Sequence, residues 1–209
     1  MAFSDFDLRT AVQTFGLRVE RDTELFAGVA PLEPSDYLRA LLDEFVPLAL
    51  ALNTEMARRE YITTPLLIEA KRRAAGPVHV LPGMALDADK SRGLNGCCDY
   101  LISRSEEIYY LRSPLAAVVE AKREDIIGGL GQCAAAMVGM RIFNERDGTP
   151  FPALFGCVSS GTNWRFLRLE EDVLFIDRRE YYIAEASLLL GILVQIMGGP
   201  KIDGTARAA

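Results

Sequence analysis

The apolar run "LAAVVEAK", residues 115–122, constrains the fold of this chain more than any other segment. Its first five residues are all hydrophobic, which predicts a strand buried on both faces at the centre of a sheet. The run nevertheless ends in two opposite charges, Glu120 and Lys122. Successive strand side chains point to opposite faces, so these two share one face, with their alpha carbons roughly 7 Å apart. The pair is therefore either a structural ion pair or part of a functional site.

The order of the expected elements indicates an α/β fold with one central mixed sheet flanked by helices. Ser35 is a good N-cap for a long amphipathic helix that reaches about Glu60, and Pro47 is expected to kink or split that helix. The other expected elements are helices over 65–76, 132–145 and 182–197, an extended piece and a loop over 76–96, a meander with strands over 97–104, 108–111 and 115–122, and strands over 151–161, 164–170 and 171–177.

One domain of moderate size accommodates most of the 209 residues. We expect residues 35–199 to form it, residues 1–34 to be a peripheral N-terminal elaboration, and residues 200–209 to be a flexible tail. The N-terminus lacks both a basic opening and an apolar core segment, so no secretory signal is visible and a cytoplasmic location is expected. The longest apolar stretch, 183–197, is too short to cross a bilayer, so no membrane partner is expected.

Composition narrows the classes of function. The chain has 23 basic and 29 acidic residues and a formal net charge of −6, which argues against a protein that coats nucleic acid nonspecifically. A local basic groove remains compatible with that charge. The four cysteines lack a CxxC spacing and His79 is the single histidine, so a zinc site is not expected. Cys97 and Cys98 are expected to be small buried residues.

A third charged residue, Asp99, gives the Glu120–Lys122 pair a chemical meaning. It lies in the expected strand upstream, where it shares a face with Cys97 and Leu101. If the two strands curl past one another, Asp99 and Glu120 approach closely enough to share a hard divalent cation, which takes oxygen ligands. Without a metal the two carboxylates would repel each other. Lys122 then lies where it is able to orient a nucleophile and stabilise charge on a phosphoryl group.

Two further polar residues extend this cluster. Glu55 lies three residues past Leu52 and seven past Leu48, which places it on the apolar stripe of its expected helix, where a charge needs a partner. It is the candidate third carboxylate. Gln132 begins the helix that follows the strand, and its amide is able to hydrogen-bond substrate or a metal-bound water. A simpler role for Gln132 is to cap that helix.

This ordered set of residues resembles the PD-(D/E)xK superfamily, the restriction-endonuclease-like nucleases. In that family a core helix carrying Glu precedes an Asp strand and then a (D/E)-x-K strand. The matching segments here are "NTEMARREYITTPLL" for the core helix, "NGCCDYLI" for the Asp strand, "VVEAK" for the second motif and "GLGQCAAAM" for a glutamine-bearing helix. The resemblance covers roughly residues 53–168. The proline that names the family is absent before Asp99, where Cys98 stands.

The resemblance implies a restriction-endonuclease-like core and a hydrolase that cleaves phosphodiester bonds of nucleic acid with Mg²⁺ or Mn²⁺. It implies Asp99, Glu120 and Glu55 as metal ligands, Lys122 as the catalytic lysine and Gln132 in support. The implied partner is nucleic acid, with DNA favoured over RNA. A homodimer is also compatible with the pattern.

Three simpler interpretations compete with a nuclease. Glu120 and Lys122 could be an ion pair at a sheet edge, worth little in stability, although the strand is too apolar for an edge. The chain could instead be a catalytically inactive nuclease-fold module that binds nucleic acid or a protein partner, which the acidic balance favours. It could also be an oligomer scaffold that associates through its apolar C-terminal helix. Fold alone does not decide among these functions.

Overall fold

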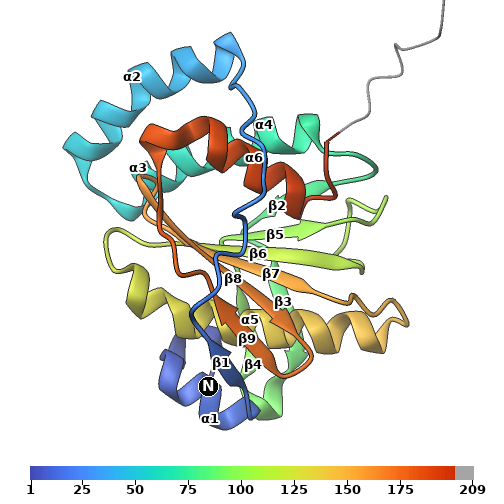
Figure 1. Ribbon diagram of the computed structural model, residues 1–209. Helices are drawn as coiled ribbons and strands as arrows, with labels where there is room; N and C mark the ends of the chain where they lie inside the picture. Colours follow the sequence, from blue (N-terminus) through green and yellow to red (C-terminus); the bar gives the residue numbers. More distant parts are fainter. Residues whose placement is uncertain (201–209) are drawn as a thin grey trace, which may run out of the picture.

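The computed structural model describes residues 1–200, and it has the expected α/β architecture, with a mixed eight-stranded sheet flanked by helices (Figure 1). The strand order is β1-β9-β8-β7-β6-β5-β2, with β10 paired to β8, and a separate hairpin joins β3 to β4. The strands are β1 (Arg18–Glu20), β2 (His79–Pro82), β3 (Ala85–Asp89), β4 (Leu94–Cys97), β5 (Tyr100–Ser103), β6 (Leu115–Ala121), β7 (Leu154–Ser159), β8 (Asn163–Glu170), β9 (Val173–Ile176) and β10 (Tyr181–Tyr182).

The two faces of the sheet are covered by different helices (Figure 1). One hydrophobic core forms between the sheet, α5, α1 and the β3–β4 hairpin, and a second forms between the sheet, α6, α4 and α2. The α-helices are α1 (Leu8–Phe15), α2 (Asp36–Leu52), α3 (Glu55–Arg58), α4 (Thr64–Arg73), α5 (Ile126–Arg146) and α6 (Ala186–Ile196); η2 (Arg59–Thr63) is a π-helix, and η1 (Phe3–Asp5), η3 (Lys90–Arg92) and η4 (Ile183–Glu185) are short 3-10 turns.

Strand β6 is the centre of the sheet, as its sequence predicts. All seven of its residues are buried. It pairs antiparallel with β5 and parallel with β7, and α5 is the crossover between the two parallel strands. Its side chains alternate between the two cores, so that Val118 faces α5 whereas Val119 faces α6. Glu120 therefore points toward α5, the same side as Val118.

The first 34 residues are not a peripheral elaboration. Strand β1 pairs in parallel with β9 and extends the edge of the main sheet. Phe3 and Phe6 are 1% and 2% exposed and belong to the core beneath α5. Gly131 of α5 permits this packing, because a Cβ atom there would lie 2.1 Å from the Asp7 carbonyl carbon. The sequence gives little sign of this role, because the apolar residues alternate with charged ones and are spread over a short helix, a three-residue strand and the loops around them.

The expected long helix is divided differently. Helix α2 begins after Ser35, whose Oγ accepts the Leu38 N–H (3.2 Å), as predicted. It runs through Pro47 without a break and ends at Asn53, a left-handed residue with φ of 48°. Helix α3, the π-turn η2 and α4 then follow without interruption to Arg73. The break at Asn53 resets the helical phase on which the placement of Glu55 depended.

Two segments, residues 108–111 and 76–96, have a different secondary structure from the one that their residue types predict. Residues 108–111 form a loop instead of a strand, because Glu107 Oε1 accepts the backbone N–H groups of Ile108 and Tyr109 at 2.9 and 2.8 Å. Such local side-chain hydrogen bonds compete with pairing in a sheet. Within residues 76–96, where one extended piece and a loop were expected, the chain forms β2 and the β3–β4 hairpin.

The cysteines of the "CC" pair differ from each other: Cys98 is buried as expected, but Cys97 is exposed at the end of β4. The expected strand over 97–104 is interrupted at this point, because the chain leaves the hairpin and enters the main sheet. Asp99 lies at this bend, directly before β5, rather than within a strand.

Helix α5 is the one helix in the described part of the chain that is long and apolar enough to cross a membrane. Its apolar window is 72% buried inside the molecule, which is how the core helix of a globular domain behaves. The shorter apolar helix over 183–197, expected at the C-terminus, is present as η4 and α6. The tail expected over 200–209 lies, after Pro200, outside the described residues.

Candidate functional site

The chain brings Asp99 and Glu120 together where β5 begins and β6 ends. The antiparallel register pairs Tyr100 with Val119, so Asp99 lies beside the last residues of β6. The Ala121 N–H donates to Asp99 Oδ2 at 2.8 Å and fixes the carboxylate over the end of that strand. The bend before β5 therefore brings Asp99 close to Glu120, a role that the sequence analysis assigned to a curled strand.

Glu120 is the most unusual side chain of this cluster. It is 1% exposed, and the Gln132 Nε2–H donates to its Oε2 at 2.6 Å. Its Oε1 is buried and has no hydrogen-bond partner among residues 1–200. Burial, together with the nearby negative charge of Asp99, raises the pKa of Glu120 well above the usual range of a glutamate, although Lys122 acts in the opposite direction. A hydrogen bond between the Glu120 and Asp99 carboxyl groups also favours the protonated form of Glu120. An ionised Glu120 would leave its buried Oε1 without a donor, which is costly unless a ligand supplies the missing interaction.

Lys122 and Glu120 are joined through Gln132. The Lys122 ammonium donates to Gln132 Oε1 at 2.8 Å, and the amide nitrogen of the same residue donates to Glu120. Gly129 of α5 allows this arrangement, since a Cβ there would lie 3.2 Å from Lys122 Cε and 2.6 Å from Val158. Gln132 thus bridges the two charges instead of capping α5, where Asp125 is the N-cap residue.

Asp99 also binds a residue that the sequence did not single out. The Arg59 guanidinium lies 3.0 Å from Asp99 Oδ1 and 2.9 Å from Glu60 Oε1. Arg59 begins the π-helix η2, a rare conformation that occurs frequently at functional sites. In the sequence, nothing distinguishes Arg59 from Arg58 beside it, because the turn that separates their directions is visible only in the structure.

Glu55 does not join the other two carboxylates as a third ligand. It is an exposed residue in the first turn of α3, just after the Thr54 N-cap, and not on the apolar stripe of a long helix. Among residues 1–200, no group of three or more His, Cys, Asp or Glu side chains is arranged to hold a metal ion. The charge of Glu55 is nevertheless one of the causes that raise the pKa of Glu120. The charge of Glu55 therefore acts on Glu120 although Glu55 is not part of the cluster.

A buried arginine fixes the start of α3 against the sheet. Arg58 is 7% exposed, and it donates to the Ser160 carbonyl oxygen at 3.0 Å and to Asn53 Oδ1 at 3.1 Å. The Asn53 amide in turn donates to Glu124, two residues beyond Lys122, at 3.3 Å. This network holds the π-turn with Arg59 at a defined position relative to the end of β6.

The residues present fit a divalent cation of the Mg²⁺ type. Mg²⁺ keeps several waters and is usually bound by one or two carboxylates together with substrate phosphates. Asp99 and Glu120 supply two adjacent carboxylates, and the ionised Glu120 would supply an Oε1 that has no donor among residues 1–200. A site with two carboxylates and a nearby lysine is therefore chemically complete once substrate oxygens are added.

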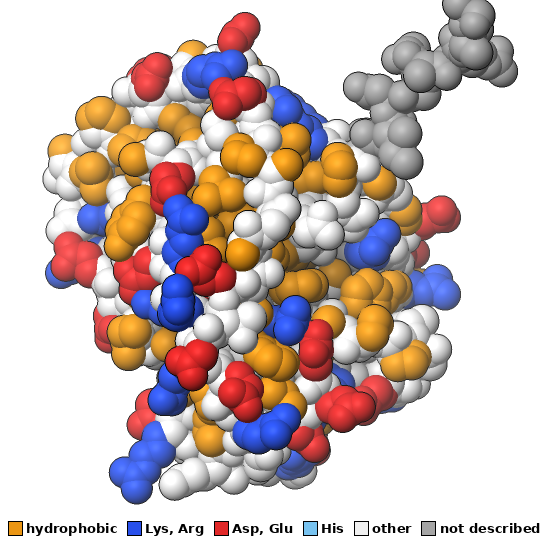
Figure 2. Space-filling view, in the orientation of Figure 1, with side chains coloured by type: hydrophobic (Ala, Val, Ile, Leu, Met, Phe, Trp, Pro, Cys, Tyr) orange, Lys and Arg blue, Asp and Glu red, His pale blue; other side chains and the backbone are white. Residues whose placement is uncertain are grey.

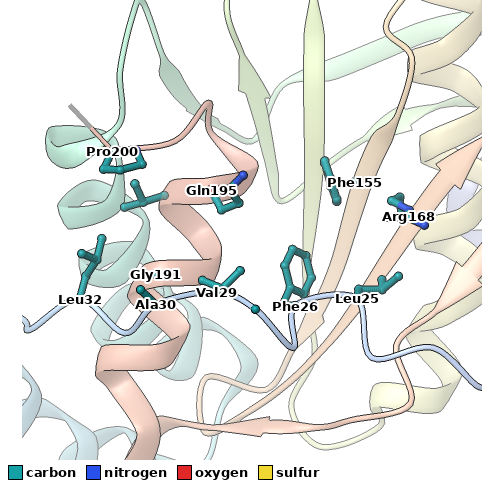
Figure 3. A pocket seen from close by; sticks show the side chains of 12 residues that line it. Leu25, Phe26, Val29, Ala30, Leu32, Phe155, Arg168, Gly191, Gln195 and Pro200 are labelled. Carbon is teal, nitrogen blue, oxygen red and sulfur yellow. The ribbon is translucent and has the colours of Figure 1, made fainter. Parts of the chain in front are cut away.

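A cavity of about 470 Å³ lies on the opposite face of the sheet (Figure 3). Phe26 of the segment before α2, Phe155 of β7 and Gln195 of α6 line it, and among residues 1–200 Arg168 is the one charged residue in its wall. Arg168 Nε lies 3.1 Å from Glu170 Oε1 but forms no hydrogen bond within the described residues, and the guanidinium carbon lies 4.6 Å from the centre of the Phe175 ring. With no pair of groups suited to acid–base or metal chemistry, this cavity is not the candidate active site.

Comparison of the chain with protein-family models, with curated proteins and with solved structures finds no match. The geometry of Asp99, Glu120, Lys122 and Gln132 is therefore the basis for assigning a function.

Proposed function

We propose that the protein is a metal-dependent nuclease of the PD-(D/E)xK type, with Asp99 and Glu120 as metal ligands and Lys122 as the catalytic lysine. The single observation that carries this proposal is the buried, unpartnered Oε1 of Glu120 beside Asp99. The restriction-endonuclease-like core remains part of the proposal. It is consistent with the order of core helix, Asp99, β6 and α5 along the chain.

Asp99 and Glu120 would hold Mg²⁺ or Mn²⁺. When bound, such a cation polarises a phosphoryl oxygen and makes a water molecule more acidic. Lys122 stabilises the negative charge that develops on the phosphate and orients the attacking water. Gln132 keeps the ammonium group of Lys122 and the carboxyl group of Glu120 at a fixed separation, because its amide bonds both.

The proposed partner is nucleic acid, with DNA as the favoured substrate. Acidic and basic side chains are interspersed over the face shown in Figure 2, with no extended basic surface. Because the net charge is −6, affinity for phosphates would come from the site itself, through the cation, Lys122 and Arg59. A cytoplasmic location is part of the same proposal.

Calorimetric titration with Mn²⁺ tests the site, together with cleavage assays on single- and double-stranded DNA and RNA. We expect the wild type to bind Mn²⁺ and cleave, and Glu120→Gln to lose both, because the amide cannot supply an anionic ligand. Asp177→Asn is the matched control, since Asp177 is also fully buried but lies outside the site.

Equal and negligible heats for wild type and Glu120→Gln, with no cleavage by either, would contradict the nuclease proposal. The chain would then be better explained as an inactive module that retains the charged cluster as a structural network.

A further inference from the structure

We infer that Arg59 is a phosphate-binding residue of this site, held on Asp99 in the metal-free protein and released to the substrate when a divalent cation binds. The inference rests on the proposed function. It starts from the Arg59 guanidinium, which lies 3.0 Å from Asp99 Oδ1, the carboxylate oxygen not taken by the Ala121 N–H.

The position of Arg59 is fixed by its own backbone. The Thr64 Oγ1 donates to the Arg59 carbonyl oxygen at 3.1 Å, and the Tyr100 hydroxyl oxygen lies 3.4 Å from the same oxygen. Thr64 and Tyr100 also contact each other, with 2.7 Å between their hydroxyl oxygens. Because Tyr100 directly follows Asp99, this hydrogen-bonded group ties the π-turn to the strand that carries the metal ligand.

The side chain, in contrast, is held by three contacts, with Asp99, with Glu60 and with the Met56 sulfur at 3.4 Å. Arg59 is 27% exposed, and apart from Asp99 its charged partner is Glu60, which is 47% exposed. Exposed ion pairs contribute little, so the guanidinium is held mainly by Asp99. A cation bound to Asp99 carries the same sign of charge and would repel Arg59 from that carboxylate.

A phosphate is the chemistry that suits the released guanidinium. Its planar fork of N–H donors matches two phosphate oxygens, and a divalent cation brings a substrate phosphate to the same place. Arg58 cannot serve this role, because its guanidinium is buried and bonded to Ser160 and Asn53. Arg59 and the cation therefore compete for Asp99 when no substrate is present and cooperate when a phosphate is bound.

The first arm of the test compares Mn²⁺ affinity by calorimetry, without nucleic acid, in wild type, Arg59→Gln and Arg72→Gln. Arg72 is the matched control, since it lies on the same helical run and is 60% exposed. Arg59→Gln is expected to bind Mn²⁺ about tenfold more tightly, within the usual range for coupling between two ligands. Arg72→Gln is expected to match the wild type.

The second arm measures binding of a short labelled duplex DNA by fluorescence anisotropy, once with EDTA and once with Ca²⁺, as a function of salt. With Ca²⁺, Arg59→Gln is expected to bind more weakly and to lower the salt slope by about one relative to wild type, as for loss of one phosphate contact. With EDTA, Arg59→Gln and wild type are expected to bind alike.

Each contrary result is informative. Equal Mn²⁺ affinity in Arg59→Gln and Arg72→Gln, or no Mn²⁺ binding by any variant, would overturn the inference. Tighter Mn²⁺ binding with an unchanged Ca²⁺-dependent DNA affinity would overturn the phosphate-binding role. A wild type that binds Mn²⁺ and DNA but cleaves no substrate would instead contradict the nuclease function, while the Arg59 comparison would still stand.

Discussion

Glu120 and Asp177 are both buried carboxyl groups, with 1% and 0% exposure, and burial raises the pKa of each above its usual value. Their hydrogen bonding differs. Both Asp177 oxygens have donors, the Arg179 N–H at 2.9 Å and the Tyr181 hydroxyl at 3.1 Å. Within residues 1–200, Glu120 has one donor and one buried oxygen without a partner.

Under the proposed function, the comparison distinguishes a structural acid, Asp177, from a metal ligand, Glu120. A fully bonded buried carboxyl organises the chain around it, as Asp177 does at the turn between β9 and β10. A half-bonded one costs stability and persists where a ligand supplies the missing interaction. Burial and a raised pKa are shared by both groups, so the unsatisfied oxygen beside a second carboxylate is what distinguishes the proposed site.

The largest effect is expected from Lys122→Met. It should lower kcat by about 10²- to 10⁴-fold, the range for loss of a positioned catalytic group, while leaving Mn²⁺ affinity within a few-fold. The matched change at the other carboxyl is Arg165→Met, because Arg165 donates to the Asp177 carbonyl oxygen at 2.9 Å. Steady-state cleavage and chemical denaturation of both variants measure the contrast. If Arg165→Met were fully folded and still lost kcat, the contrast between Lys122 and Arg165 would be contradicted.

Asp177→Asn should lower the free energy of unfolding by about 1–3 kcal/mol, since an amide cannot accept hydrogen bonds at both positions and leaves one donor unpaired. Cleavage per folded molecule should match the wild type. Urea denaturation followed by circular dichroism measures the change. A variant as stable as the wild type would show that the Asp177 hydrogen bonds do not organise this turn.

Glu120→Gln should change stability in the opposite direction. Without metal, and near pH 8, the free energy of unfolding should rise by about 1 kcal/mol or more, because removal of a destabilised charge is worth about 1.4 kcal/mol per unit of pKa shift. Thermal denaturation in EDTA measures it. A loss of several kcal/mol would mean that the Glu120 carboxylate is a structural group like Asp177.

The smallest effect is a pH dependence. Between the ordinary pKa of a glutamate and the raised pKa of Glu120, the unfolded chain releases a proton that the folded protein keeps, so stability falls as pH rises through this window. The metal-free wild type should therefore lose stability relative to Glu120→Gln from about pH 4.5 upward. Mn²⁺ should restore it, because the cation binds the ionised carboxylate. Denaturation of both proteins across pH, with and without Mn²⁺, measures this. If the free energies of unfolding of wild type and Glu120→Gln changed with pH in parallel, the prediction would be wrong.

The sequence was most informative where one pattern had one structural solution. The apolar run of β6 could only be a central strand, and its terminal charges placed Glu120 and Lys122 on one face. Gln132 followed from its place in the helix after β6, although that helix begins at Ile126 and not at Gln132 as expected, and the bridging geometry was not predicted. Asp99 was identified correctly as a neighbour of Glu120, but for a different reason, because it lies at a bend and not in the strand.

The remaining features depended on backbone changes that residue types do not encode. Glu55 was misplaced because the left-handed Asn53 interrupts the helix between it and Leu52. Arg59 was missed because the π-turn, which directs it toward Asp99, has no signature in the sequence. Positions of this kind are determined by tertiary packing, and they occur here beside the candidate site.

The parallel pairing of β1 with β9 has a consequence for the order in which the chain folds. Contacts between residues far apart in sequence form late, because a long loop must first be closed. During synthesis, Phe3 and Phe6 are made well before α5, against which they pack, and β1 waits longer still for Val173–Ile176. Until those later elements exist, the aromatic residues of this segment have no core to enter, so they stay exposed and favour association with other chains.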